Sequence, residues 1–212
     1  MKLIMLGAPG AGKGTQAEKI AEKLNIPTIS TGFIIRKAIS AQTELGKIAK
    51  KFIDEGQLVP DDVIIKILFE RIEEDDCKNG FILDGFPRTI PQAQALVDAD
   101  IHVDKVLNLD VPDEVVLERL TGRRECSKCG RPYHILHNKP QVEGKCDDCG
   151  AELIQRPDDN PDTISSRLSV YHKQTEPLIR FYNEMGVLAY VQSKKTVEKT
   201  TQEAFKALGV EL

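Results

Sequence analysis

The sequence predicts an α/β fold in which helices flank a parallel β-sheet core and two inserted segments interrupt the alternation. Short apolar runs, each suited to a buried strand, alternate with amphipathic stretches of helical length along most of the 212 residues. One inserted segment carries a helical pattern without a strong strand, and the other is rich in Cys, Gly, Pro and Asp. These features favour a sheet that is covered on both faces.

The N-terminal strand and helix are the clearest elements. Residues 2–6 form an apolar run that ends at Gly7, and residues 13–24 then carry apolar side chains along one helical face. Strands separated by helices of this length pair in parallel through right-handed crossovers. Further strands are predicted at residues 80–84, 105–110 and 187–191, and a closing helix at residues 196–208.

The inserted segments divide the chain. A long helix is predicted to begin at Asn160-Pro161 and to continue to about residue 184, with Asn as the N-cap, Pro in the first turn and Gly186 beyond the end. The expected insertions are residues 30–59 and 126–161, and the expected core comprises residues 1–29, 60–125 and 162–212.

The composition limits the classes of function. The formal net charge is −4, whereas proteins that bind duplex nucleic acid usually present a basic face. No apolar run approaches the roughly 20 residues that a membrane-spanning helix requires, and the N-terminal run is too short for a signal peptide. We therefore expect a cytoplasmic monomer without nucleic-acid or membrane partners, whose five cysteines stay reduced.

Residues 7–13 fit the phosphate-binding pattern G-x-x-x-x-G-K, between a predicted strand and a predicted helix. Glycines let backbone N–H groups approach phosphates, the helix N-terminus adds partial positive charge, and Lys13 adds a full charge. We therefore expect a P-loop NTPase-like core. Because Gly14 separates Lys13 from Thr15, the usual magnesium-binding hydroxyl is displaced by one residue, which favours a nucleoside monophosphate kinase over a standard GTPase or ATPase.

Six arginines lie near the ends of predicted helices and loops around this motif. Phosphoryl transfer requires charge neutralisation and alignment of two phosphate groups, and guanidinium groups bind phosphate oxygens bidentately. For any single arginine, a solvated surface position is the competing interpretation. Arg119 and Arg123 are four residues apart on the helix predicted after Pro112, so we expect them to share a face. The six are Arg36, Arg88, Arg119, Arg123, Arg156 and Arg167.

Asp84 ends the strand predicted at residues 80–84. A carboxylate at this edge of a sheet can hold magnesium through water. A turn-forming Asp is the competing interpretation, so the position alone does not establish a magnesium site.

Two segments resemble the signature segments of adenylate kinases. They are GAPGAGKGT at residues 7–15 and LDGFPRT at residues 83–89. The resemblance implies a five-stranded parallel core, a helical AMP-binding insertion at residues 30–59 and a lid at residues 126–161. It also implies reversible phosphoryl transfer, ATP + AMP = 2 ADP, with magnesium. Shorter matches at residues 30–32, 122–124, 158–159 and 174–175 extend the resemblance over essentially the whole chain.

The resemblance also implies roles for matched positions. Asp84 would hold magnesium through water, and Thr31 and Gln92 would contact the adenine of AMP. The residues implied to catalyse transfer are Lys13, Arg88, Arg123, Arg156 and Arg167. Those implied to bind ATP are Gly10, Ala11, Gly12, Lys13, Gly14, Thr15, Arg119, Arg123, Pro132, Tyr133 and Lys195. Those implied to bind AMP are Thr31, Arg36, Gln57, Leu58, Val59, Gly85, Phe86, Pro87, Arg88, Gln92, Arg156 and Arg167.

Four cysteines form two C-x₂-C pairs that are sixteen residues apart. Four thiolates at this spacing can surround zinc tetrahedrally with no open position, which is typical of a structural site. Two disulfides are the competing interpretation, which a reducing cytosol disfavours. Zinc in the lid would make the chain resemble the zinc-containing, long-lid bacterial adenylate kinases. The predicted ligands are Cys126, Cys129, Cys146 and Cys149, whereas Cys77 is expected to be a partly buried structural residue.

Phe33 departs from the adenylate kinase pattern, which commonly has Asp at this position. An Asp could accept hydrogen bonds from magnesium-bound water, and Phe cannot. We therefore expect either a weaker hold on magnesium or a Phe33 side chain that packs beside Ile34 and Ile35 and faces away from the site.

Three other functions compete with an adenylate kinase. A nucleoside monophosphate kinase of the UMP/CMP type would share the phosphate-binding loop. A nucleotide switch would need an Asn-Lys-x-Asp motif for guanine, and the Asn-Lys at residues 138–139 lacks the Asp. A zinc-ribbon nucleic-acid binder would account for the cysteines but not for the negative charge or for the segment at residues 83–89.

Overall fold

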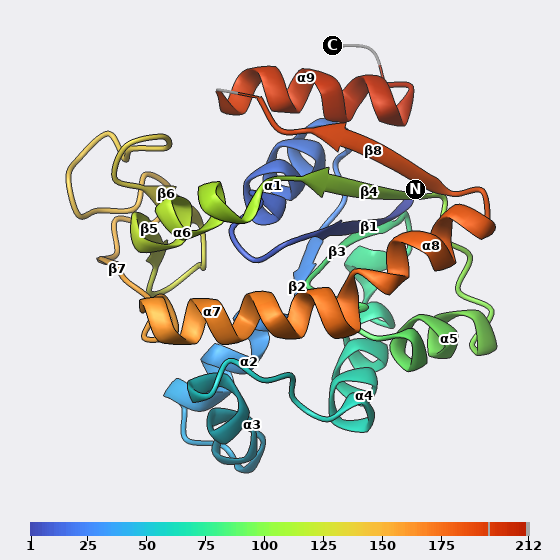
Figure 1. Cartoon of the computed structure of the whole chain (residues 1–212), viewed down its shortest axis with the longest axis horizontal. Coiled ribbons are helices and arrows are strands. Elements are labelled where there is room, and N and C mark those ends of the chain that lie inside the picture. The colour runs from blue at the N-terminus through green and yellow to red at the C-terminus, as the bar shows by residue number, and fades with distance from the viewer. Residues whose placement is uncertain (195, 211–212) are drawn as a thin grey trace.

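The computed structural model describes residues 1–194 and 196–210, and its centre is a five-stranded parallel sheet (Figure 1). The strand order is β2-β3-β1-β4-β8, so β1 lies in the middle between β3 and β4. The prediction of an α/β fold with a parallel sheet core is confirmed. The strands are β1 (Lys2–Gly7), β2 (Thr28–Ser30), β3 (Phe81–Asp84), β4 (Lys105–Asp110) and β8 (Leu188–Gln192).

Strand β2 is absent from the pattern of apolar runs. Its three residues pair with β3 from Thr28 opposite Ile82 to Ser30 opposite Asp84. A strand this short, with a single apolar residue between Thr and Ser, offers no alternation that sequence periodicity could detect. Its pairing brings the start of the next helix beside the end of β3.

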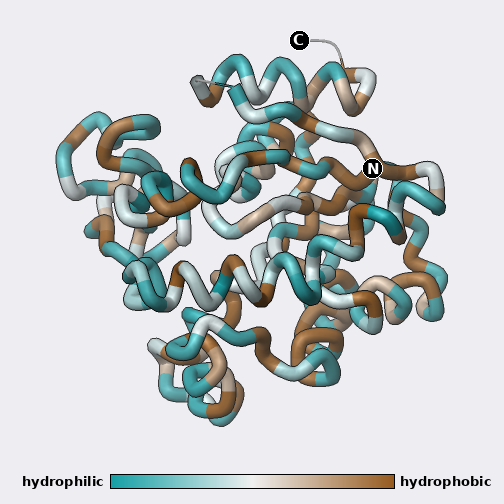
Figure 2. The backbone as a smooth tube through the Cα atoms, viewed as in Figure 1, coloured by the Kyte–Doolittle hydropathy of each residue, from teal (hydrophilic) through white to brown (hydrophobic). Residues whose placement is uncertain are grey.

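Alternate side chains of the strands enter two hydrophobic clusters, one on each face of the sheet. On β1, Leu3 and Met5 belong to the first cluster, and Ile4 and Leu6 belong to the second. Figure 2 shows hydrophobic residues concentrated along the central strands and the helices beside them. The first cluster includes residues of α1 (Lys13–Leu24), α6 (Asp113–Thr121) and α9 (Val197–Leu208), and the second includes residues of α4 (Asp61–Ile72), α5 (Ile90–Asp98) and α8 (Pro177–Glu184).

Helices α2 (Thr31–Ser40) and α3 (Glu44–Asp54) form most of residues 30–59, which we name the helical insertion (Figure 1). The two helices approach each other closely, because a Cβ atom on Gly46 would lie 2.1 Å from the carbonyl oxygen of Ala38. Each helix is preceded by a hydroxyl residue, Ser30 or Thr43, whose side chain accepts a hydrogen bond from a backbone N–H in the first turn.

Apolar side chains attach the helical insertion to the core. Ile35 of α2, Ala49 of α3 and Val59 are buried and belong to the second hydrophobic cluster. The insertion therefore extends the core of the domain and has no separate core of its own.

Residues 126–161, which we name the lid, are built on a small antiparallel sheet with the order β6-β5-β7. Its strands are β5 (Arg123–Cys126), β6 (Pro132–His134) and β7 (Leu153–Ile154), so the sheet begins three residues before the expected boundary. Its buried cluster consists of Cys126, Tyr133 and Cys146. The loops around it are predominantly hydrophilic (Figure 2).

The prediction that Arg119 and Arg123 share a helical face is wrong. Helix α6 ends at Thr121, which leaves Arg119 on the helix and Arg123 on strand β5. The reason is tertiary pairing: β5 has an antiparallel partner on each side, and these strand contacts outweigh continuation of the helix.

The helix predicted from Asn160 to about residue 184 is interrupted. Asn160 caps α7 (Pro161–Val170) as expected, since its side chain accepts a hydrogen bond of 3.0 Å from Thr163 N. A π-helical turn at Tyr171–Thr175 follows, and α8 then begins at Pro177. Proline has no N–H for the α-helical bond to the preceding turn, so the wider turn lies where that bond is lost.

Within residues 1–194 and 196–210, no helix combines the length and the apolar character needed to cross a membrane.

Candidate active site

A cavity of about 590 Å³ lies at the carboxyl edge of the central sheet, with walls from the helical insertion and the lid. A smaller cavity of about 70 Å³ lies beside the helical insertion. Ligands of open parallel sheets bind at this edge. Arg36, Arg88, Arg156 and Arg167 line both cavities, so the two cavities meet at a cationic boundary.

Most of the predicted site residues line one of these cavities. The larger cavity is lined by Gly10, Ala11, Gly12, Lys13, Gly14, Thr15, Arg119, Arg123, Pro132 and Tyr133 from the predicted ATP set, and by Gly85 and Pro87 from the AMP set. The smaller cavity is lined by Thr31, Gln57, Leu58, Val59 and Gln92 from the AMP set.

Three predicted residues differ from this arrangement. The side chain of Phe86 is fully buried in the second hydrophobic cluster. Tyr133 lines the larger cavity, but its hydroxyl is bound within the lid, where it accepts a 2.7 Å hydrogen bond from Asp147 N and lies 3.5 Å from Cys146 Sγ. Lys195 lies outside the described residues.

The loop between β1 and α1 presents a helix N-terminus to the larger cavity. Gly7, at the end of β1, has φ 135°, and a Cβ atom there would lie 2.5 Å from Leu109 O, so the chain can leave the strand this way only with glycine. Gly12 precedes α1 and provides no side-chain cap. The first N–H groups of α1 are therefore suited to bind an anion.

Lys13 is partly buried beside this loop. Its Nζ donates hydrogen bonds of 2.8 Å to the carbonyl oxygens of both Gly7 and Ala8. Burial lowers the pKa of Lys13 to about 7, with a further decrease from Arg88 and Arg167 that Asp84 opposes. An anionic phosphate beside Nζ would raise this pKa again, because it favours the charged form.

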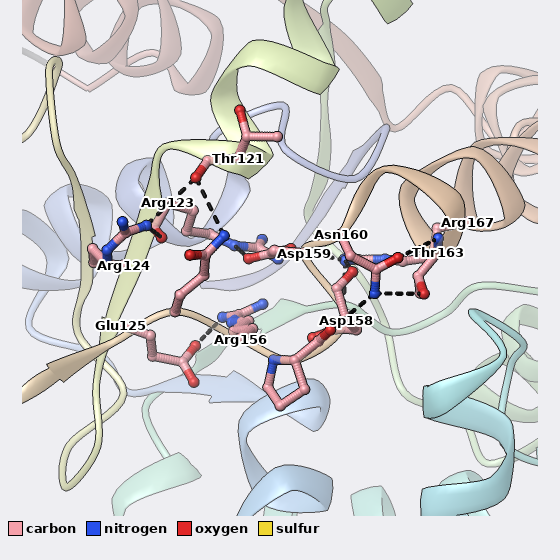
Figure 3. A network of polar contacts seen from close by, with 12 residues as sticks. Thr121, Arg123, Arg124, Glu125, Arg156, Asp158, Asp159, Asn160, Thr163 and Arg167 are labelled. Carbon is pink, nitrogen blue, oxygen red and sulfur yellow. Dashed lines mark hydrogen bonds and ion pairs between the residues drawn. The ribbon is translucent and has the colours of Figure 1, made fainter.

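Glu125 connects an arginine of the helical insertion with an arginine of the lid. Its carboxylate accepts hydrogen bonds from Arg36 Nε at 3.0 Å and from Arg36 Nη2 at 2.9 Å, and it also accepts one from Arg156 Nη2. The contact with Arg156 is visible in Figure 3. The Glu125 side chain is 6% exposed, so water does little to screen its ion pairs with the two arginines.

Asp158 and Asp159 bind two further arginines (Figure 3). Asp159 Oδ2 accepts a 2.8 Å hydrogen bond from Arg123 Nε, and its Oδ1 lies 3.1 Å from Arg167 Nη1. Asp158 forms a 2.9 Å ion pair with Arg167. Burial alone would raise the pKa of Asp158, but Arg167 and neighbouring arginines outweigh burial and lower it.

Arg88 differs from the other arginines at the boundary between the cavities. Its Nε donates a 2.8 Å hydrogen bond to Gly85 O, and no carboxylate among the described residues forms an ion pair with it. Burial, followed by repulsion from Arg167, lowers its pKa to about 10, so the guanidinium remains charged at neutral pH. Of the four arginines, Arg88 therefore has the most capacity to bind an added anion.

The backbone around Arg88 is fixed by polar side chains. Gln92 Oε1 accepts a 2.7 Å hydrogen bond from Arg88 N, and Gln92 Nε2 donates one of 2.7 Å to Asp61. Thr175, in the π-helical turn, donates one of 2.8 Å to Arg88 O. Thr31 donates one of 2.9 Å to Gly85 O. These contacts use part of the hydrogen-bonding capacity of Thr31 and Gln92, the two residues expected to contact adenine.

Asp84 fits the proposed magnesium position. A Cβ atom on Gly14 would lie 3.4 Å from Asp84 Oδ2, so the carboxylate faces the phosphate-binding loop, and it lines the larger cavity. No protein donor among the described residues forms a hydrogen bond with its side chain. Carboxylate oxygens with free lone pairs are what a hydrated magnesium ion requires.

The four cysteines of the lid fit zinc. Their Sγ atoms all lie within 4.8 Å of one another, and the distances include 3.4 Å for Cys126–Cys149 and 3.6 Å for Cys129–Cys146. All four thiols are free. In a tetrahedral site with zinc–sulfur bonds of about 2.3 Å, the sulfur–sulfur distances are close to the ones found here. Cys77 is also free and is buried, with its Sγ 3.0 Å from Arg71 Nη1.

Phe33 contacts the lid. A Cβ atom on Gly130 would lie 2.5 Å from the Phe33 ring, so the ring packs against the Cα of this glycine, which has φ 78°. Lys37 Nζ lies 5.9 Å from the ring centroid. Phe33 is not among the described residues that line either cavity. A packing role for Phe33 was one of the two expectations. Neither expectation included its contact with Gly130 of the lid.

Sequence patterns did not predict Glu125, Asp61 and Thr175 as part of the site. Glu125 stands between Arg124 and Cys126, one of the four clustered cysteines, and belongs to no motif. Its one signal is proximity to two expected site residues. Asp61 lies after Pro60 in the first turn of a helix, where acidic residues are common for a different reason, the helix dipole.

Residues 5–187 match the protein family described as adenylate kinase. The chain is 54% identical to an adenylate kinase of Caldicellulosiruptor saccharolyticus over the full length of both chains. It is 53% identical to one of Agathobacter rectalis over 99% of this chain and 100% of that protein. It is 51% identical to one of Staphylococcus epidermidis over 98% of this chain and 99% of that protein. The chain belongs to the adenylate kinase family.

Proposed function

We propose that the chain transfers a phosphoryl group reversibly from ATP to AMP to give two ADP. The observation that carries the proposal is the set of four arginines that line both cavities, because two bound nucleotides would bring their phosphates together there. Family membership supports a phosphotransferase that acts on a nucleoside monophosphate.

The donor nucleotide is assigned to the larger cavity. The helix N-terminus after Gly12 and the charge of Lys13 are suited to the ATP phosphates. The residues proposed to bind ATP are Gly10, Ala11, Gly12, Lys13, Gly14, Thr15, Arg119, Arg123 and the backbone of Pro132 and Tyr133.

The acceptor nucleotide is assigned to the smaller cavity and the boundary beside it. Arg36 and Arg88 are proposed to bind the AMP phosphate, and Thr31 and Gln92 to contact adenine with the hydrogen-bonding capacity they retain. The further residues proposed to bind AMP are Gln57, Leu58, Val59, Gly85, Phe86, Pro87, Arg156 and Arg167, with Phe86 acting through its backbone.

The chemistry assigned to the protein is alignment and charge neutralisation. The AMP phosphate is already an anionic nucleophile, so the mechanism needs no general base. Lys13, Arg88, Arg123, Arg156 and Arg167 would neutralise charge on the transferred group. Magnesium bound with ATP supplies further neutralisation of phosphate charge, and Asp84 would hold its water ligands.

The helical insertion and the lid are proposed to close over the two nucleotides, and adenylate kinases are themselves an example of lid closure. Closure would exclude the water that otherwise could accept the phosphoryl group. Zinc bound by Cys126, Cys129, Cys146 and Cys149 would stabilise the lid without taking part in transfer, because a four-cysteine site has no open position.

The test is ADP formation from ATP with AMP, UMP or CMP as the acceptor. We expect AMP to be preferred, and Arg88→Ala to reduce kcat/KM for AMP by at least about a hundredfold, the effect of losing one transition-state donor. Arg180→Ala is the matched control, because Arg180 lies on the outside of α8 and is 86% exposed. If UMP or CMP is preferred, that nucleotide and not AMP is the acceptor. Near-normal activity of Arg88→Ala would refute the proposed phosphate site.

A further inference from the structure

Glu125 occupies two adjacent N–H donors of Arg36, the kind of pair that binds a carboxylate or a phosphate bidentately. Arg36 donates to it through Nε and Nη2, which form one bidentate fork of the guanidinium. The remaining nitrogen, Nη1, faces the helix backbone, because a Cβ atom on Gly32 would lie 3.0 Å from it. The fork that is directed away from the helix is therefore the one that Glu125 occupies.

Arg156 is only partly satisfied by the same carboxylate. Its Nη2 donates to Glu125, while its Nε is buried and has no hydrogen-bond partner among the described residues. A buried donor without an acceptor is unfavourable, so this guanidinium retains the capacity to bind a further anion. Arg156 lines both cavities.

The charges in this cluster do not balance. Arg36 and Arg156 carry two positive charges, and Glu125 carries the one negative charge that is bound to both. A phosphate dianion at the boundary between the cavities would neutralise both arginines. Arg88, which would share that phosphate, forms no ion pair with a described carboxylate and needs no exchange of partner.

We propose that Glu125 is an internal competitor of the AMP phosphate and thereby sets the affinity for AMP. Carboxylate and phosphate compete for the same guanidinium groups, so AMP binding includes the displacement of Glu125 from Arg36. This inference rests on the proposed function of Arg36 and Arg156 in binding AMP. It assigns to Glu125 a role in AMP affinity and none in the chemical step.

The experiment measures the dissociation constants of AMP and of ATP, each titrated alone by calorimetry, for Glu125→Gln and the unmodified protein. We expect AMP to bind about tenfold more tightly to the variant, which corresponds to about 1.4 kcal/mol. ATP affinity should change by a smaller factor than AMP affinity. Glu125 contacts Arg156, which would bind the transferred phosphoryl group, but it does not contact Lys13 or Arg119. Glu143→Gln is the matched control, since it removes one lid carboxylate at an exposed position.

A second readout separates competition from a purely structural role. Removing one partner of a buried ion pair destabilises a protein, so Glu125→Gln should lower the Tm of the free protein. Competition predicts that saturating AMP then raises Tm by more in the variant than in the unmodified protein. If Glu125→Gln does not fold, Glu125→Asp, which retracts the carboxylate by one methylene group, should tighten AMP binding by a smaller factor.

Unchanged or weaker AMP binding to Glu125→Gln overturns the inference. Arg36→Ala then identifies what has failed. If Arg36→Ala weakens AMP binding, Arg36 binds AMP as proposed and Glu125 does not compete with it. If Arg36→Ala leaves AMP binding unchanged as well, the proposed AMP site is wrong, and the inference fails with it.

Discussion

The helical insertion and the lid both bring arginines to one cavity, but they are stabilised in different ways. In the insertion, Ile35, Ala49 and Val59 enter a hydrophobic cluster that includes strands of the central sheet. In the lid, the buried cluster contains one tyrosine and two of the four clustered cysteines, Cys126 and Cys146. Apolar packing therefore orders the first region, and metal ligation is the means available to order the second.

A segment without a large hydrophobic core can still position its side chains accurately. Strand β5 carries Arg123, which lines the larger cavity, and Glu125, which binds Arg36 and Arg156. The same strand ends at Cys126 in the cysteine cluster. A tetrahedral zinc site would fix the end of this strand, and it would thereby also hold Arg123 and Glu125 in position. The helical insertion achieves the same for Arg36 because Ile35 is anchored in the core.

The largest expected effect is loss of the lid without zinc. Chelation of zinc, or Cys146→Ser, should lower Tm, with residues 126–161 unfolding at a lower temperature than the central sheet, because metal-binding energy in structural sites, on the order of 10 kcal/mol, is folding energy. Hydrogen exchange should accelerate in β5, β6 and β7 and stay slow in the central sheet. Cys77→Ala, at the buried cysteine outside the cluster, is the control.

Activity provides the check on the assigned role of the metal. At temperatures where the metal-free lid remains folded, transfer should persist, because the site offers no position for substrate. Immediate loss of activity in folded, metal-free protein would indicate a catalytic metal.

Gly46→Ala should disturb the helical insertion and leave the lid intact. The added Cβ atom would lie 2.1 Å from Ala38 O, so α2 and α3 must separate. Overpacking of this kind costs about 1–3 kcal/mol. AMP binding should weaken more than ATP binding, because Arg36 lies on α2, and zinc content should not change. Lys47→Ala, at the adjacent exposed position, should stay within about 0.5 kcal/mol of the unmodified stability. Unchanged stability of Gly46→Ala would show that the two helices are not tightly packed.

The smallest expected effect is proton uptake by Lys13 when ATP binds. With a pKa of about 7, Lys13 is mostly neutral at pH 8, and the phosphates should restore its charge. Calorimetry in buffers of different ionisation enthalpy should detect uptake approaching roughly one proton at pH 8. Lys13→Met should abolish it. Arg36→Ala should not change it, because the arginines that lower this pKa are Arg88, Arg167 and Arg123.

The same pKa shift makes stability depend on pH in a defined direction. Between about pH 7 and the ordinary lysine value of 10.5, the unfolded chain binds a proton at Lys13 that the folded protein does not bind. This group therefore increases the stability of the free protein as pH rises through that window. In the calorimetric experiment, proton uptake on ATP binding that persists in Lys13→Met would assign the proton to another group.

The sequence allowed prediction of the parts of the site that depend on local geometry. Lys13 follows a strand and begins a helix, and the cysteine pairs have fixed spacing, so both were recognisable. Arg123 was assigned to a helix because its pairing with His134 on β6 is a strand contact that the helical spacing of Arg119 and Arg123 does not reveal. The contacts of Glu125 and Phe33 join the lid to the helical insertion, and no periodicity within either segment predicts such a contact.

The small size of the apolar cluster in the lid has a thermal consequence. Burial of apolar surface gives unfolding its large heat capacity, and the resulting stabilisation weakens on cooling. Bonds between a bound zinc ion and the thiolates of Cys126 and its partners would not have that origin. The lid should therefore keep its order across a wide range of temperature, and on cooling the helical insertion is the region whose attachment weakens first.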